Sequence, residues 1–179
     1  LIAPIANGYT AKYLCSHTFT SKLDADIALE RYVKPMHILF RGVVPEIDTA
    51  AKTVTVKYFG ILRPRTAVWR EGCGCTLLVE RTPADLRDKH HVPNRRASIT
   101  KDTSDALWPL GDQVNRDSIR DTIDWTAIDH ILDKEMQGQS TPGAKRNTTL
   151  ALVVVWKGQI IGERYAEGVD EHTSLLGWS

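Results

Sequence analysis

The sequence predicts a mixed α/β (α+β) fold in which an antiparallel sheet is flanked by helices. Three observations predict it. Residues 53–59 alternate apolar and polar side chains, as a half-buried strand does. Residues 125–136 repeat apolar side chains on one helical face. Residues 150–156 form a nearly continuous apolar run, and a tight turn at Lys157-Gly158 leads into a returning strand.

Composition limits the class of protein. The chain has 179 residues, of which 42% are hydrophobic and 25% charged, so it can build a sizeable core and is not intrinsically disordered. A formal net charge of +1 gives no electrostatic reason to propose nucleic acid or an acidic lipid surface as a partner. The longest apolar run, Leu150 to Trp156, is far shorter than the roughly 20 residues of a bilayer-spanning helix, so a membrane span in this chain is excluded.

The first half of the chain predicts one helix and a small meander. The first eight residues lack the features of a whole signal peptide, although they could follow one. A short helix is expected over residues 23–33, with Leu23, Ile27 and Tyr32 as its apolar side chains, Asp24 or Ser21 as its cap and Pro35 near its end. Extended runs at 53–59, 66–70 and 75–79 predict an antiparallel meander.

The second half begins with a long polar connection, residues 81–115, which is interpreted as a wandering loop. Asp124 is expected to cap the helix over 125–136. The hairpin 150–165 follows, and a strand as apolar as its first one is expected to be covered on both faces.

Three cysteines leave several possibilities open. Cys73 and Cys75 are separated by one residue and are not expected to bond to each other. A bridge from Cys15 to either of them is plausible and would close a loop of about 60 residues. Three buried free thiols are the alternative, since an odd count is typical of reduced compartments. Cys-x-Cys supplies too few ligands for a metal site.

The carboxyl-terminal segment resembles a known family. The hairpin Thr149–Gly168, followed by Thr173-Ser-Leu-Leu-Gly-Trp-Ser179, resembles the penicillin-recognising serine hydrolases. The resemblance is closest to the branch of the 6-aminohexanoate-dimer hydrolases and beta-lactamase class C-like esterases. It implies a beta-lactamase-like fold in which this hairpin opens the central antiparallel sheet. Ser179 matches the nucleophilic serine.

The amino-terminal part resembles an extra module that precedes the hydrolase domain in bacterial members of this branch. The segments that carry this resemblance are Tyr13-Leu-Cys-Ser16, residues 65–72 and residues 74–78. The resemblance implies a Cys15–Cys75 disulfide and leaves Cys73 as the spare thiol. The domains are therefore expected at 1–115, an α+β module with its wrapping loop, and 116–179, the start of the hydrolase domain.

The implied catalytic machinery is incomplete in this chain. A serine hydroxyl needs a neighbouring base, and in the family that base is a lysine three residues further on or a tyrosine, neither of which this sequence reaches. The nucleophile's backbone N–H would be one oxyanion-hole donor. The remainder of the hydrolase domain is expected as a partner, possibly a second chain. A sequence cut short at this point is the alternative.

The function implied is hydrolysis of a small amide or ester substrate through an acyl-enzyme, with Ser179 attacking the carbonyl. No metal or organic cofactor is implied, and nucleic acid is not expected as a partner. One alternative is a non-catalytic cell-envelope binding protein on the same fold. Another is a member directed at beta-lactams or peptidoglycan. The expected disulfide points to a bacterial periplasm or other exported location.

Other residues receive structural interpretations. Trp178 is expected to pack against the hairpin, and Tyr165 to lie on the returning strand without a catalytic role. The pair His90-His91 is interpreted as part of a solvated loop, and Arg95-Arg96 as too short for a nucleic-acid patch. Asp129 and Asp133 share one polar helix face and are expected to be solvated.

Overall fold

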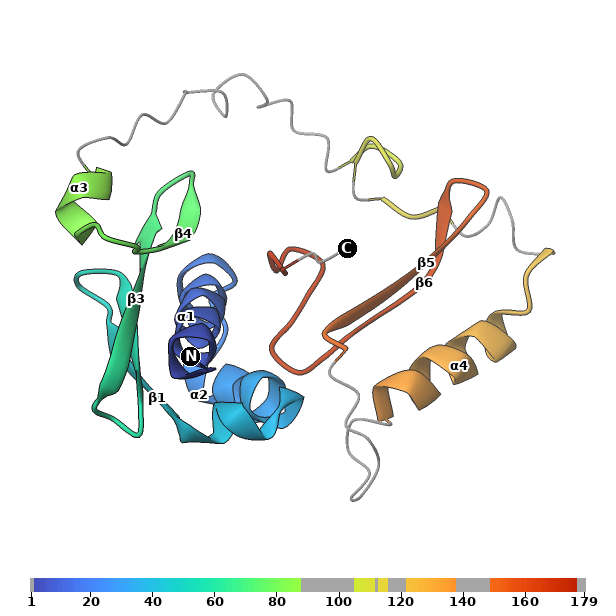
Figure 1. Ribbon diagram of the computed structural model, residues 1–179. Helices are drawn as coiled ribbons and strands as arrows, with labels where there is room; N and C mark the ends of the chain where they lie inside the picture. The colour runs from blue at the N-terminus through green and yellow to red at the C-terminus, as the bar shows by residue number, and fades with distance from the viewer. Residues whose placement is uncertain (1, 88–104, 112, 116–121, 138–148, 177–179) are drawn as a thin grey trace. The chain divides into compact units, whose positions relative to one another are not determined.

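The computed structural model describes residues 2–87, 105–111, 113–115, 122–137 and 149–176. It shows a mixed α+β protein with antiparallel sheets and helices (Figure 1). Two compact units can be distinguished. The first comprises Leu1–Asn94 together with Thr173–Ser179, and the second Arg95–His172. The sequence-based division was placed instead at residue 115, with 173–179 in the second domain.

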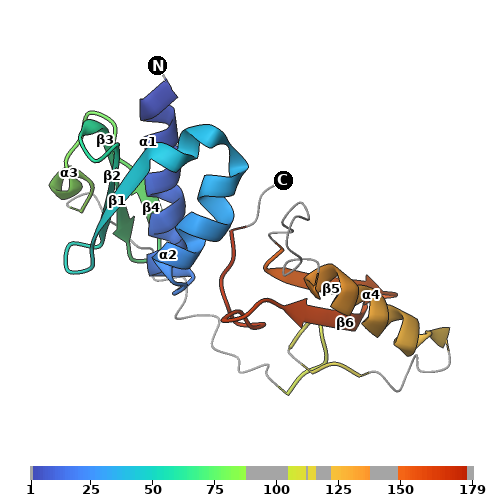
Figure 2. The same cartoon turned by 90° about the horizontal axis from the view of Figure 1, so that it is seen from below.

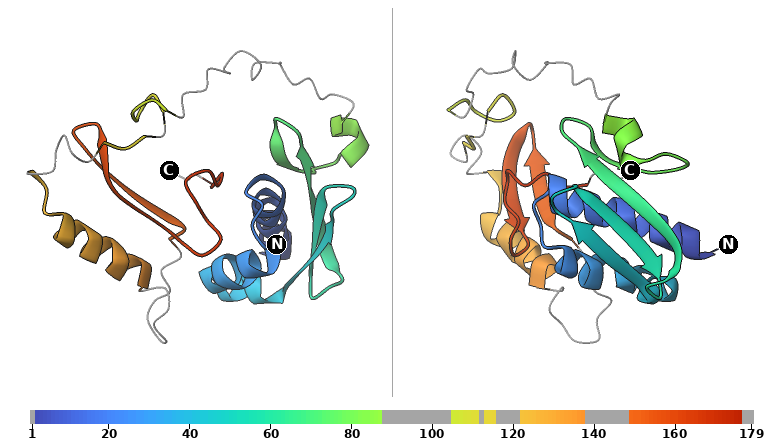
Figure 3. Two further views of the ribbon diagram at one scale, coloured as in Figure 1. Left: turned by 180° about the vertical axis from the view of Figure 1, so that it is seen from behind. Right: turned by 90° about the vertical axis from the view of Figure 1, so that its left-hand side faces the viewer.

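The first unit is a four-stranded antiparallel sheet with a long helix on one face. The strands are β1 (Val43–Asp48), β2 (Thr53–Tyr58), β3 (Leu62–Arg70) and β4 (Gly74–Leu77), paired in sequence order. Three of them were predicted, and β1 was not. The helix α1 (Ile2–Cys15) packs along β2 and β3, as the two views in Figure 3 show. This helix was not predicted.

The core of the first unit lies between α1 and the inner face of the sheet. Val54, Val56 and Ala67 are fully buried there against Leu14 and Cys15 of α1. Asn7 on the same helix is also fully buried, and its side-chain Nδ2 donates to the backbone oxygens of Leu62 and Arg63 at 3.1 and 2.7 Å. Hydrogen bonding of a buried amide offsets the cost of removing it from water. Asn7 therefore joins α1 to the beginning of β3.

A run of short helical segments connects α1 to the sheet. They are η1 (Ser16–Thr20), α2 (Ala25–Ala28), η2 (Leu29–Val33), η3 (Lys34–Met36) and η4 (Ile38–Gly42). The predicted helix at 23–33 is confirmed as α2 and η2, and Asp24 caps it by accepting N–H bonds from Asp26 and Ile27, each at 2.9 Å. Of its expected apolar side chains, Tyr32 packs against the core, whereas Ile27 is exposed. The buried residues are Ala28, Leu29 and Val33.

The connection after β4 is more structured than predicted. It contains the helix α3 (Pro83–Arg87), and an isolated bridge pairs Leu107 with Gln113. The rest of the predicted loop lies largely outside the described residues.

The second unit is a helix packed on a hairpin. Its elements are α4 (Trp125–Gln137), β5 (Ala151–Trp156) and β6 (Gln159–Tyr165), close to the predicted bounds. Asp124 caps α4 by accepting the N–H of Ala127 at 3.0 Å. Gly162 of β6 allows α4 to pack closely on the hairpin. A Cβ at this position would lie 2.5 Å from Leu132 Cδ1 and 3.0 Å from Ile128 Cγ2.

The predicted cover on both faces of β5 is not found. Leu132, Ile160 and Ile161 are buried where α4 meets the hairpin, whereas Val153 and Val155 are about half exposed. Among the described residues of this unit, only α4 packs on the hairpin, so one apolar side of the strand remains open to solvent.

Candidate functional site

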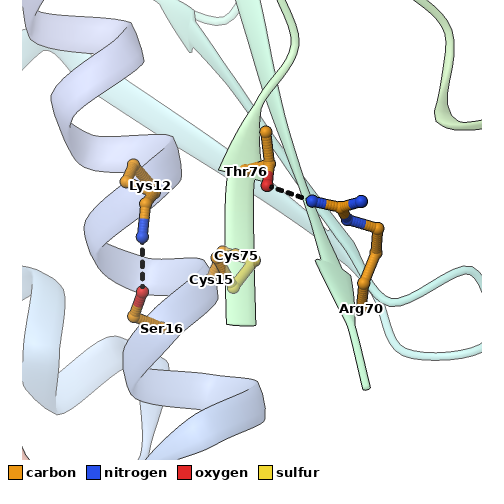
Figure 4. The surroundings of a disulfide bond; sticks show 6 residues. All are labelled: Lys12, Cys15, Ser16, Arg70, Cys75 and Thr76. Carbon is orange, nitrogen blue, oxygen red and sulfur yellow. Dashed lines mark hydrogen bonds between the residues drawn. A yellow bond between two sulfur atoms is a disulfide. The ribbon is translucent and has the colours of Figure 1, made fainter. Parts of the chain in front are cut away.

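The disulfide joins the end of α1 to the start of β4 (Figure 4). The sulfurs of Cys15 and Cys75 are 2.13 Å apart, and their Cα atoms 6.0 Å. The pairing implied by the family resemblance is therefore confirmed, and the alternatives of three free thiols or a Cys15–Cys73 bridge are wrong. Cys73 lies outside the bond and is exposed. Disulfides persist in oxidising compartments, so this bond is compatible with export.

A small cavity of about 180 Å³ lies beside this disulfide within the first unit. Its walls come from the end of α1, the start of β4 and the segment 174–176. Lys12 Nζ donates to Ser16 Oγ at 3.3 Å at this place (Figure 4). The cavity therefore holds a hydrogen-bonded pair formed by Lys12 and Ser16.

The predicted nucleophile itself lies outside the described residues. The description ends at Leu176, so Ser179 and Trp178 have no structural account. The same is true of His90, His91, Arg95 and Arg96. Ser174, Leu175 and Leu176, which directly precede the Gly-Trp-Ser sequence, line the cavity described above.

The expected exposure of Asp129 and Asp133 on one side of α4 is found, since their side chains are 46% and 50% exposed, but their binding partner was not predicted. Both carboxylates bind Arg164 of β6, with Asp129 Oδ1 accepting from Nη2 at 2.9 Å and Asp133 Oδ1 from Nε at 2.7 Å. The four-residue step places both on the same side of α4, where the hairpin passes. These hydrogen bonds raise the pKa of the Arg164 guanidinium, since they favour its charged form. The three residues join α4 to β6.

Tyr165 lies at the end of β6 and has a structural partner. Its hydroxyl donates to Glu163 Oε2 at 2.7 Å. Burial and the bond to this carboxylate raise the pKa of the phenol well above its usual range. A phenol that holds its proton so firmly is a poor general base near neutral pH.

The described residues contain neither a cluster of metal ligands nor a helix that could span a membrane. Within them, no three His, Cys, Asp or Glu side chains cluster in a way that could hold a metal ion. No helix among them is both long enough and apolar enough to cross a bilayer.

Sequence reasoning missed two features of the described residues. Arg164 was not singled out, although a strand cation opposite two aspartates four residues apart on a preceding helix is a recognisable pattern. His17 was also overlooked. It is 1% exposed and lies in a row of aromatic rings, because a histidine four residues after Tyr13 on a buried helix stacks on that ring.

The chain was compared with protein-family models, with curated proteins and with solved structures, and none of the three comparisons found a match.

Proposed function

We propose that this chain forms the amino-terminal module and the beginning of the hydrolase domain of a serine hydrolase that cleaves amide or ester bonds. One observation carries the proposal: the order of helix α4, apolar hairpin β5–β6 and then the Gly-Trp-Ser sequence at 177–179. This is the order that the resemblance to penicillin-recognising serine hydrolases implies. The Cys15–Cys75 disulfide, which the same resemblance implied, adds support.

In the proposed reaction, the Ser179 hydroxyl attacks the substrate carbonyl. The attack forms an ester between Ser179 and the acyl group and releases the amine or alcohol, and water then hydrolyses that ester. A base must take the hydroxyl proton. Tyr165 is unsuited to this step because its pKa is raised and its hydroxyl is bonded to Glu163. The proposal therefore assigns the base to a lysine or tyrosine beyond residue 179.

The open side of the hairpin supports a partner segment. Two-stranded hairpins are marginally stable alone, and their unpaired edges favour the addition of strands. Val153 and Val155 are about half exposed, which suits a strand that lies inside a larger sheet. The proposal is that further strands and helices of the hydrolase domain pair with β5–β6 and bring the base and the second oxyanion donor.

We place the protein in a bacterial periplasm or another exported location. The support is the Cys15–Cys75 bond, since disulfides are rare where thiols are kept reduced.

The test is active-site labelling of the complete protein that contains this chain. A fluorophosphonate probe should phosphonylate the Ser179 hydroxyl of the wild-type protein and release fluoride. Mass spectrometry should locate the adduct on the peptide that contains the Gly-Trp-Ser sequence. Ser179→Ala should abolish labelling. Ser174→Ala is the matched control, because Ser174 is an exposed serine of the same segment, and it should label normally.

A folded complete protein with an intact disulfide that fails to label at Ser179 would overturn the proposal in favour of a non-catalytic binding protein. A fluorescent penicillin separates the remaining alternative. Its stable attachment to Ser179 would identify a member directed at beta-lactams or peptidoglycan, whereas labelling by ester probes alone supports an amidase or esterase.

A further inference from the structure

Three segments of the first unit meet at one end of the sheet. They are the first turns of α1, the helical turn η4 and the turn that joins β2 to β3. Asn7 on α1 donates to the backbone oxygens of Leu62 and Arg63, the first two residues of β3 directly after that turn. The N–H of Phe59 donates to the oxygen of Gly42, the last residue of η4, at 2.7 Å. Figure 2 shows the amino end of α1 at the same end of the unit as these segments.

This end carries a group of exposed apolar side chains, which we call the apolar cap. Their exposed fractions run from 49% to 78%, with Ile61 the highest. The apolar cap consists of Ile2, Ile5, Ile38, Phe59, Ile61 and Leu62. Single exposed apolar residues are ordinary on protein surfaces, but several large ones on adjoining segments favour an interaction surface.

The segments that carry the apolar cap contain basic residues and no acidic ones. Residues 2–11, 35–43 and 58–65 contain three arginines, Arg41, Arg63 and Arg65, and no Asp or Glu, although the whole chain has 22 acidic residues. Arg41 and Arg63 are exposed. Within the described part of the chain, no carboxylate forms an ion pair with any of the three. The guanidinium groups of Arg41 and Arg63 are therefore available to an external anion, whereas Arg65 Nη1 donates to the backbone oxygen of Pro64 at 3.0 Å.

We propose that the apolar cap binds the surface of an anionic lipid bilayer. Apolar side chains that project beside arginines match the chemistry of a membrane interface, where acyl chains lie just below negatively charged headgroups. A second copy of this chain fits less well, because two identical basic rims would face each other and repel. The apolar cap belongs entirely to the first unit, so the inference does not depend on the hydrolase proposal.

The test is sedimentation of the full chain with lipid vesicles. Vesicles of phosphatidylcholine with added phosphatidylglycerol should carry the protein down, and vesicles of phosphatidylcholine alone should carry far less. Binding should weaken as salt is raised, since the surface potential is screened. Arg41→Gln and Arg63→Gln should each weaken binding about fivefold.

Apolar variants provide the second arm of the test. The double substitution Phe59→Ser, Ile61→Ser should weaken vesicle binding at least about tenfold. Leu110→Ser is the matched control, because Leu110 of the second unit is 79% exposed and Ile61 is 78% exposed. Circular dichroism and an intact disulfide establish that each variant is folded.

Three outcomes would overturn the inference. One is failure of the folded wild-type chain to bind anionic vesicles. Another is an equal loss of binding in the Leu110→Ser control. The third is dimerisation in vesicle-free solution that the Phe59→Ser, Ile61→Ser variant abolishes, which would show that a second copy covers the apolar cap.

Discussion

His17 is a polar residue in an aromatic environment. Its ring centroid lies 4.4 Å from that of Tyr13 and 5.9 Å from that of Tyr32, and its side chain is almost completely buried. Among the described residues, Nδ1 has no hydrogen-bond partner. Burial lowers the pKa of the imidazole from its usual 6.5, because the charged form would lose its hydration without a compensating bond.

This lowered pKa predicts a loss of stability in acid. Below about pH 6.5 the unfolded chain binds a proton at His17 while the native protein does not, so the free energy of unfolding falls with pH until the lower native pKa is passed. Urea unfolding at a series of pH values from about 7.5 to about 5 measures the slope.

The comparison with His17→Phe isolates the contribution of this histidine, since the other five histidines are common to both proteins. The variant keeps a ring against Tyr13 and cannot titrate, so its stability should depend less on pH. Equal slopes in the two proteins would contradict the assignment.

At the scale of elements, Gly162 sets the distance between α4 and the hairpin. A methyl group at this position would meet Leu132 Cδ1 at 2.5 Å, so Gly162→Ala should destabilise the protein by about 1–3 kcal/mol through overpacking. Chemical denaturation followed by circular dichroism measures the change.

A double-mutant cycle tests the cause. Leu132→Ala removes the atoms that the new methyl would strike, so the double variant should lose less stability than the sum of the two single variants. Additive losses would show that the strain arises somewhere other than this contact.

Elements with a regular apolar period were predictable from the sequence, and those without one were not. The helix α4 has a clear apolar period, and the hairpin β5–β6 has a continuous apolar run followed by a tight turn. Both elements lie close to their expected bounds. Helix α1 was missed because its buried face carries polar and small residues, among them Asn7, Gly8 and Thr10, while Ile2 and Ile5 are exposed. The helix therefore shows little contrast between an apolar and a polar face. Strand β1 was missed because Pro45 interrupts it, which an edge strand tolerates.

The candidate site was predictable only in part. The resemblance gave the correct cysteine pair, which spacing alone left open. The exposed face of Asp129 and Asp133 was predicted, but their partner was not, because Arg164 is 31 residues or more away in sequence and becomes a neighbour only when the hairpin packs on α4. The even overall charge likewise concealed the basic rim of the apolar cap, since it arises from three segments that folding brings together.

At the scale of the whole molecule, the Cys15–Cys75 disulfide closes a long covalent loop. Cys15 and Cys75 are 60 residues apart, so the bond reduces the entropy of the unfolded chain and should stabilise the first unit by about 4 kcal/mol. The double variant Cys15→Ser, Cys75→Ser should lose stability of this order in chemical denaturation. Cys73→Ser is the matched control, and it should unfold like wild type. Equal losses from both variants would mean that the bond contributes little.

The same bond would hold the first unit together after a cut in its backbone. All four strands of the sheet begin between the two bonded cysteines, and the exposed turn after Asp48 is the kind of site that proteases attack. A single nick there would leave both fragments covalently tethered, and they would separate on a denaturing gel only after a reductant had been added.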